Sequence, residues 1–177
     1  MSNKHSGLPS LPLQMSFLQV IGLRDPGEGD WTRLRTLQYS ELHKVSLIRI
    51  AAHGLAAMLA VTLYLGAIAN WLLGIWMLTV VAAVWNVTRI DRKFIDIEKR
   101  GVQWNEFTRQ ALGVGGCTIP WVAALMFFVP QGTTTDHYAL WAIAAMLIAG
   151  SAAAMATAPV ATVLFDLVVG AAGVASF

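Results

Sequence analysis

The chain is poor in charged residues, and beyond Arg109 it contains no lysine or arginine at all. Only 12% of its 177 residues are charged, whereas soluble domains typically carry about 25%. After Arg109 the only charged side chains are those of Asp136 and Asp166. Together with 56% hydrophobic residues and a mean hydropathy of +0.61, this shortage of charge excludes an ordinary soluble domain and predicts an integral membrane protein.

Cysteine and catalytic motifs are scarce as well. The single cysteine, Cys117, cannot form an internal disulfide, and no second soft ligand lies near it in the sequence to suggest a metal site. We find no phosphate-binding glycine loop, no HExxH motif and no nucleophile elbow. Pro9 and Pro12 interrupt the run after Lys4, so a secretory signal peptide is not expected. We therefore expect no enzyme, no cofactor and no metal in this chain.

A basic segment at residues 90–109 separates long apolar runs. It contains Arg92, Lys93, Lys99, Arg100 and Arg109. Lysine and arginine concentrate in the cytoplasmic loops of membrane proteins. The segment therefore predicts a cytoplasmic loop and, with it, a cytoplasmic N-terminus in a multi-pass protein of the bacterial inner membrane. We interpret the formal charge of +2 as charge that orients the protein and meets anionic lipid, with no nucleic-acid partner.

The apolar runs predict an all-α polytopic membrane bundle. About 20 apolar residues are needed to cross roughly 30 Å of hydrocarbon. We expect five spans, at about 46–69, 71–88, 110–129, 138–158 and 159–177. The last run stops at GAAGVASF without a charged flank, so we expect a six-span domain that is cut short at its C-terminus.

Two regions follow from these spans. We expect residues 1–45 to form a cytoplasmic tail with an interfacial amphipathic helix from Trp31 to about Lys44; a solvated helical extension is an open alternative. Residues 46–177 form the transmembrane domain, incomplete at its C-terminus. Within it, we expect a turn near Asn70, a second helix that continues into water as far as Arg100, and a third helix that starts near Trp104 or Asn105.

Small residues predict where these helices pack closely. Ala52, Ala56 and Ala60 repeat every four residues in the first span, which is typical of a face that lets another helix approach. In the third span, three glycines at 113, 115 and 116 offer close packing. Pro120 in the same span is expected to kink its helix by removing a backbone hydrogen bond.

Polar side chains inside the spans are the candidates for function, because such groups are costly in lipid. Arg49 and His53 lie one helical turn apart in the first span, and Asp166 lies seven residues into the fifth. At about 1.5 Å per residue, His53 and Asp166 are both roughly 10 Å below the cytoplasmic face, and Asn86 approaches that depth. We expect Arg49, His53, Asn86 and Asp166 to form one buried polar cluster.

Three interpretations of this cluster stay open. In the first, the cluster is a structural set of contacts that fixes helix register. In the second, it is a site that senses a ligand, a proton or a metal, and His53 titrates near neutral pH. Ligation of haem or metal is the third, and the lack of a second intramembrane histidine disfavours it.

Several local features resemble the N-terminal membrane regions of bacterial GGDEF and GGDEF–EAL signalling proteins. A basic helix, LRTLQYSELHK, precedes the first span, and the hairpin that follows ends in WNVTRIDRKF. An aromatic-basic entry leads into a glycine-rich third span in WNEFTRQALGVGGCTIPW, and the alanine-rich fourth and fifth spans turn at a proline in LWAIAAMLIAGSAAAMATAPVATVLF. The resemblance covers about 33–177. No GGDEF or EAL motif occurs in this chain, so no catalytic residue is carried over.

The resemblance implies a membrane-embedded sensory, anchoring and dimerising domain. Its output would be a cytoplasmic diguanylate cyclase or phosphodiesterase domain, which acts on cyclic di-GMP and follows a sixth span in the same polypeptide. The expected partners are the lipid bilayer and a second copy of the chain. The alternatives are the input domain of a sensor histidine kinase, a non-enzymatic subunit of a larger membrane complex, and a small transporter.

Overall fold

The computed structural model describes residues 39, 42–95, 104–154 and 158–176. Within these ranges the chain is helical and has no β-strand; one isolated bridge joins Leu65 and Ile68. The predicted all-α class is therefore confirmed. The α-helices are α3 (Leu42–Tyr64), α4 (Asn70–Asp91), α5 (Trp104–Phe127), α6 (Thr134–Ala154) and α7 (Pro159–Ala175), with two short 3₁₀ turns, η1 (Arg92–Phe94) and η3 (Val129–Gln131).

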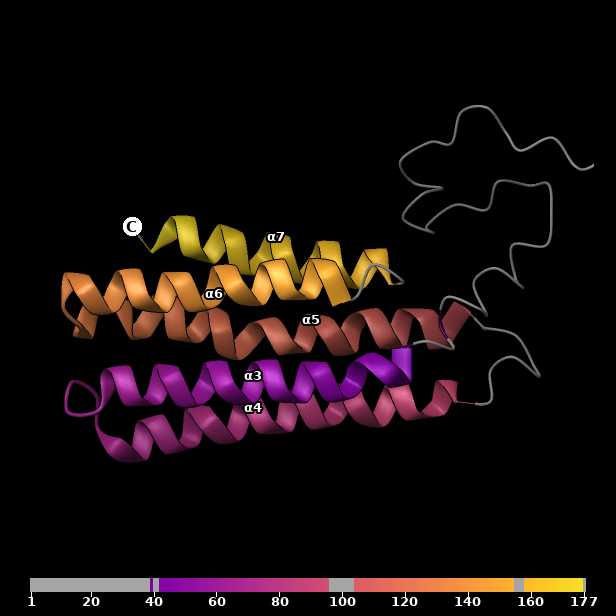
Figure 1. Ribbon diagram of the computed structural model, residues 1–177, viewed down its shortest axis with the longest axis horizontal. Helices are drawn as coiled ribbons and strands as arrows, with labels where there is room; N and C mark the ends of the chain where they lie inside the picture. Colours follow the sequence, from indigo (N-terminus) through magenta and orange to yellow (C-terminus); the bar gives the residue numbers. More distant parts are fainter. Residues whose placement is uncertain (1–38, 40–41, 96–103, 155–157, 177) are drawn as a thin grey trace, which may run out of the picture.

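The five helices lie side by side with their long axes nearly aligned (Figure 1). Their main contacts form a closed ring in the order α3, α4, α5, α7, α6 and back to α3. α5 and α6 follow each other in the chain but touch little, because α7 packs against α5. We call the end of the bundle where α4 stops and α5 starts the basic end, since it holds Arg89, Arg92, Lys93 and Arg109.

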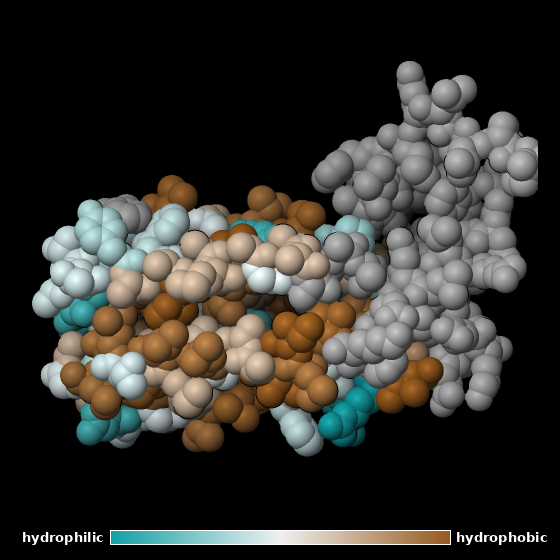
Figure 2. Space-filling model, in the orientation of Figure 1, coloured by the Kyte–Doolittle hydropathy of each residue, from teal (hydrophilic) through white to brown (hydrophobic). Residues whose placement is uncertain are grey.

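Three helical segments of the described residues are long and apolar enough to cross a membrane. They are Val45–Tyr64, Asn70–Phe94 and Asn105–Gln131, of 20, 25 and 27 residues, which corresponds to about 30–40 Å. Figure 2 shows apolar atoms over the middle of one face, with hydrophilic atoms toward its left end and lower right. All five predicted spans are thus present as helices, and three of them meet the requirements for crossing. That α6 and α7 also cross stays a prediction.

The turn between α3 and α4 lies earlier than we expected. α3 ends at Tyr64, five residues before the predicted end at Ala69. Gly66 has a φ of +89°, a left-handed conformation that glycine adopts without steric cost. The carbonyl of Tyr64 accepts hydrogen bonds from the N–H groups of Ala67 and Ile68, both at 3.1 Å. The predicted boundary was wrong because apolar residues continue through the turn, and Gly66 was the signal that marked it.

The boundaries at the basic end agree better with the sequence. α4 continues past the predicted membrane span as far as Asp91 and leads into η1, as the predicted helical extension requires. α5 begins at Trp104 and α7 at Pro159, both at the predicted positions. The outer part of the extension, 96–100, lies outside the described residues, and so does most of the predicted interfacial helix at 31–44.

At the opposite end, Thr133 and Asp136 form a reciprocal cap at the start of α6. The backbone N–H and the hydroxyl of Thr133 both donate to Asp136 Oδ2, at 2.8 and 2.7 Å. The N–H of Asp136 reaches back to the Thr133 hydroxyl at 3.4 Å. This is a capping box with aspartate as the acidic partner. The hydrogen bonds from Thr133 favour the charged carboxylate and hold the pKa of Asp136 below its ordinary value.

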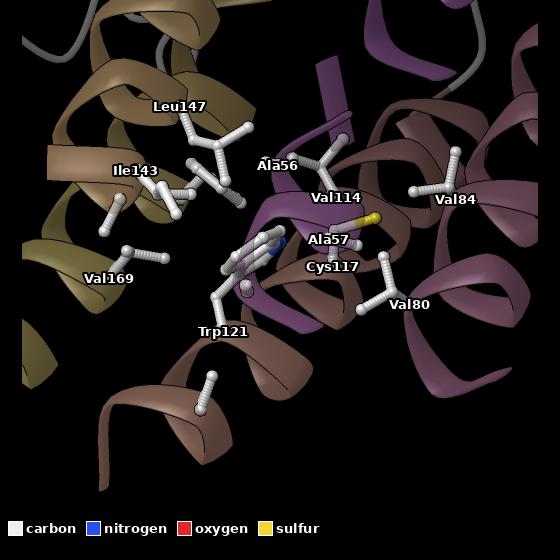
Figure 3. Packing of buried hydrophobic residues seen from close by; sticks show 14 of the residues in the cluster. Ala56, Ala57, Val80, Val84, Val114, Cys117, Trp121, Ile143, Leu147 and Val169 are labelled. Atoms are coloured by element: carbon white, nitrogen blue, oxygen red, sulfur yellow. The ribbon is translucent and has the colours of Figure 1, made fainter. Parts of the chain in front are cut away.

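Trp121 of α5 fills the centre of the bundle and is fully buried. Figure 3 shows labelled apolar side chains from all five helices gathered around it. Ala56 and Ala60 are buried as the small-residue pattern predicted, whereas Ala52 is exposed. α5 runs without interruption through Pro120; the kink there stays a prediction.

Two of the three glycines in α5 sit at close helix contacts. A Cβ at Gly113 would lie 2.8 Å from the side chain of Ile90 in α4, and one at Gly115 would lie 2.9 Å from that of Leu164 in α7. Gly116 has open space beside it. The predicted packing role is therefore confirmed for Gly113 and Gly115 and is wrong for Gly116.

Candidate functional site

A buried ion pair joins the start of α3 to the last turn of α4. Arg49 Nη1 donates to Asp91 Oδ2 at 2.5 Å, and the two side chains are only 5% and 0% exposed. Ser46, one turn before Arg49, donates its hydroxyl to the same oxygen at 3.0 Å. Burying either charge alone would cost several kcal/mol, because a lone ion loses its hydration without compensation. The pair therefore holds α3 and α4 in register at the basic end.

Gln110 brings a third helix, α5, to this ion pair. Its side chain is fully buried and lies beside the Asp91 carboxylate. Neither the amide nitrogen nor the amide oxygen of Gln110 makes a hydrogen bond to a described residue, and the same is true of Asp91 Oδ1. Buried polar atoms of this kind are commonly satisfied by ordered water. The site thus keeps hydrogen-bonding capacity for a small polar molecule.

His53 is buried one turn further along α3, in contact with α5 and α7. The indole N–H of Trp121 donates to His53 Nδ1 at 3.0 Å, and the ring of Phe165 lies edge-on to the imidazole with centroids 5.7 Å apart. Since the indole only donates, His53 Nδ1 must offer a lone pair, and the neutral ring carries its proton on Nε2. Protonation at Nδ1 would break this bond. The predicted titration near neutral pH would therefore require His53 to separate from Trp121.

Asp166 of α7 is half-buried and pairs with α6. Ser151 donates its hydroxyl to Asp166 Oδ1 at 2.5 Å. Ser151 also lines a crevice of about 70 Å³ between α3 and α6, together with Arg49 and His53. That volume accommodates only a few water molecules. Ser151 is thus the link between Asp166 and the predicted residues on α3.

The structure brings three of the four predicted residues into one region. Arg49, His53 and Ser151 line the same crevice, and Asp166 is bonded to Ser151. Asn86, by contrast, is exposed on α4, on the face turned away from the buried stripe of that helix. A sensing role for this site stays a prediction.

Four residues that complete the site were not predicted from the sequence: Asp91, Gln110, Trp121 and Ser151. Asp91 was assigned to the basic loop because it stands between Ile90 and Arg92. Its position nevertheless continues the buried stripe of α4, which includes Val80, Val84 and Val87, at helical spacings of three and four. That spacing was an available signal. No comparable signal identified Trp121 or Ser151, because their partners come from other helices.

The described residues contain no group of three or more His, Cys, Asp or Glu side chains that could hold a metal ion. Cys117 is free and buried. The chemistry of the site is therefore that of an ion pair with hydroxyl, amide and imidazole neighbours.

Comparisons with known proteins found no match. No protein family, no curated protein and no solved structure is significantly similar to this chain. The resemblance to GGDEF signalling proteins accordingly rests on the sequence features alone.

Proposed function

We propose that this chain is a membrane-embedded sensory, anchoring and dimerising module of a bacterial signal-transduction protein. In this proposal it crosses the inner membrane with its basic end in the cytoplasm. It regulates a cytoplasmic output domain that makes or degrades cyclic di-GMP and belongs to the same polypeptide. The chain itself supplies no catalytic group.

The observation that carries the proposal is the buried pair of Arg49 and Asp91. Its two charges are hidden between α3 and α4 at the basic end, where an output domain would be attached. A buried ion pair adds little stability compared with apolar residues of the same volume, and its best-attested use is to specify how helices fit together. Ionisable residues within membrane helices are functional candidates for the same reason.

The neighbouring contacts give this pair a route to the rest of the bundle. Ser46 bonds the pair to the beginning of α3. The buried side chain of Gln110, near the beginning of α5, lies beside it, and the crevice beside Arg49 reaches α6. A stimulus that binds the crevice, or that repacks α3 against α6, acts on the pair directly. Signalling requires two arrangements of the helices that the stimulus favours unequally, and the pair is the element that we expect to differ between them.

The charge distribution supports the proposed orientation. Lysine and arginine mark the cytoplasmic side of membrane proteins, and all the basic residues described beyond α3 lie at the basic end. The dimer rests on the resemblance, and the exposed apolar faces of the helices are compatible with it.

The test is made in cells that carry the complete gene. Cyclic di-GMP is measured by mass spectrometry in the parent strain, in a deletion strain, and in strains with Arg49→Ala or Asp91→Asn at the chromosomal locus. Asn86→Ala serves as the matched control, because Asn86 is exposed and outside the site. Membrane abundance of each variant is measured by immunoblot so that loss of protein is not mistaken for loss of signalling.

We expect the deletion to change cyclic di-GMP, both site variants to shift it at equal abundance, and Asn86→Ala to leave it unchanged. If deletion leaves cyclic di-GMP unchanged, the cyclic di-GMP proposal is wrong. Phosphotransfer in isolated membranes would then favour the histidine-kinase alternative. Haem or chlorophyll absorbance in the purified protein would instead favour a subunit of a larger membrane complex.

A further inference from the structure

At the basic end, one face of α4 and of the η1 turn that continues it carries two arginines and a tryptophan beside a crevice. Trp85, Thr88, Arg89 and Arg92 are the residues that line it, and its volume is about 360 Å³. Their spacing of three, four and seven residues places all four on one side of the helix over two turns. The crevice lies outside the buried site, because Asp91 faces the other way, toward Arg49.

The geometry of Arg92 and Trp85 makes this a preformed surface. The guanidinium carbon of Arg92 lies 5.8 Å from the centroid of the Trp85 ring, within the range of a cation–π contact. Holding Arg92 there reduces the freedom that it would lose on binding a ligand. Arg89 stands between the two in the sequence and lines the same crevice.

Within the described part of the chain, the two arginines have no acidic partner. No described carboxylate forms an ion pair with Arg89 or Arg92, and both side chains are exposed. Thr88 does not compete for a ligand, since its hydroxyl donates to the carbonyl of Val84 at 2.8 Å. Among the described residues, nothing acidic occupies the donors of these two positive charges, and the surface therefore suits an anion.

The surroundings restrict the kind of anion. Trp85 is 63% exposed on a helix that is long and apolar enough to cross a membrane. An indole ring favours the boundary between hydrocarbon and headgroups, and arginine side chains from the last turn reach the phosphate level. The ligand must meet an apolar ring and two guanidinium groups in one crevice, which is the chemistry of a phospholipid.

We propose that Trp85, Arg89 and Arg92 form a binding site for the headgroup of an anionic phospholipid. The phosphodiester accepts hydrogen bonds from the two guanidinium groups, an arrangement for which arginine is well suited. The part of an acyl chain nearest the headgroup lies along the Trp85 ring. A zwitterionic lipid is bound less well, because its own ammonium group offsets the phosphate charge. The inference rests on the membrane location in the proposed function and is independent of the signalling role.

A second basic crevice supplies the matched control. Lys93, Glu106 and Arg109 line a space of about 300 Å³ between the end of α4 and the start of α5. It holds the same number of basic residues at the same end of the bundle, but it contains a carboxylate and no tryptophan. Arg89→Gln/Arg92→Gln and Lys93→Gln/Arg109→Gln therefore remove equal charge from two different places.

The experiment counts lipids bound to the purified full chain by native mass spectrometry in a neutral detergent. Phosphatidylglycerol is titrated in, and phosphatidylcholine and inorganic phosphate are titrated separately. A basic residue near an anionic surface is worth about fivefold in affinity. We expect Arg89→Gln/Arg92→Gln to weaken phosphatidylglycerol binding roughly 25-fold and Lys93→Gln/Arg109→Gln to weaken it several-fold less. Phosphatidylcholine should bind more weakly to the wild type, and inorganic phosphate should not compete at matched concentration.

Equal effects of the two double variants would refute a specific site, because they would show that the lipid responds only to the total positive charge at the basic end. No effect of Arg89→Gln/Arg92→Gln, or full competition by inorganic phosphate, would overturn it as well. If that variant does not fold by circular dichroism, Arg92→Lys decides: it keeps the charge but loses the planar fork, and unchanged binding would refute the geometry. Failure of the wild-type chain to float with vesicles would refute the membrane location itself, a result distinct from any of these.

Discussion

The indole N–H of Trp121 in α5 donates to Nδ1 of His53 in α3 across the centre of the bundle, at 3.0 Å. Both side chains are buried, at 0% and 7% exposure. The bond fixes the tautomer of the imidazole and joins two helices that the chain places far apart. It also explains why a histidine is tolerated in an otherwise apolar core.

Replacing Trp121 with phenylalanine removes this donor and leaves His53 Nδ1 buried without a partner. The unpaired nitrogen and the smaller ring both destabilise the fold, and we expect the free energy of unfolding to fall by about 2–4 kcal/mol. Trp71→Phe is the control, because Trp71 is 66% exposed, and it should change stability by less than about 0.5 kcal/mol. The measurement is unfolding by SDS in mixed micelles. Equal effects of the two substitutions would contradict the bond.

The tautomer of His53 is a separate prediction. Nitrogen-15 NMR of the imidazole should show an unprotonated Nδ1 and a protonated Nε2 in the wild type. In Trp121→Phe, Nδ1 loses its donor, and its resonance should move toward that of a free lone pair. A wild-type spectrum with the proton on Nδ1 would show that the bond to Trp121 is absent.

The cap between Thr133 and Asp136 predicts a pH dependence. The pKa of Asp136 lies below its ordinary value because the Thr133 hydroxyl and N–H bond the carboxylate. A lowered folded-state pKa contributes stability above the unfolded pKa of about 3.9, and this contribution is lost as the pH falls through the folded-state value. Thr133→Ala should raise the pKa of Asp136 toward its ordinary value, as measured by carbon-13 NMR titration of the carboxyl group.

Thr134→Ala is the control for this prediction, because no hydrogen bond joins the exposed Thr134 side chain to Asp136. It should leave the titration of Asp136 unchanged. If the Asp136 carboxyl titrates at the same pH in Thr133→Ala and in the wild type, the Thr133 hydroxyl does not form the hydrogen bond to it.

Two glycines one turn apart in α7 should respond in opposite directions to the same substitution. A Cβ at Gly173 would lie 2.9 Å from the ring of Trp141, whose indole N–H donates to the Gly173 carbonyl at 3.1 Å. A Cβ at Gly170 meets nothing within 4 Å. We expect Gly173→Ala to lower the free energy of unfolding by about 1–3 kcal/mol, because the rigid ring must move.

Gly170→Ala, by contrast, should be neutral or stabilise by up to about 1 kcal/mol, because alanine favours the helix. The two variants are compared by SDS unfolding under identical conditions. Similar stabilities would mean that α6 and α7 are not packed as closely at Gly173 as the structure shows.

Helix content was largely predictable from this sequence, because long apolar runs leave few alternatives. The starts of α5 and α7 followed from a basic-aromatic flank and a proline. The end of α3 was not located correctly, because Gly66 is surrounded by apolar residues and the apolar run continues past it. Local pattern thus located the helices but not every turn.

The candidate site was predictable only in part. Arg49, His53 and Asp166 were found because ionisable groups are rare in apolar spans. Asp91 could have been found from its place in the buried stripe of α4, but Trp121 and Ser151 could not, because the sequence does not contain the spatial order of their helices. The prediction for Asn86 was wrong for a different reason: depth along α4 alone was considered, and its side chain lies on the exposed face of that helix.

The most direct test of this account is a double-mutant cycle on the buried pair of Arg49 and Asp91. Arg49→Met, Asp91→Leu and the double variant are unfolded in SDS, and their free energies are compared with that of the wild type. We expect each single substitution to cost about 3–5 kcal/mol, because it leaves the other charge buried alone, and the double variant to cost less than either. Single costs that simply add in the double variant would contradict the claim that these two charges join α3 to α4.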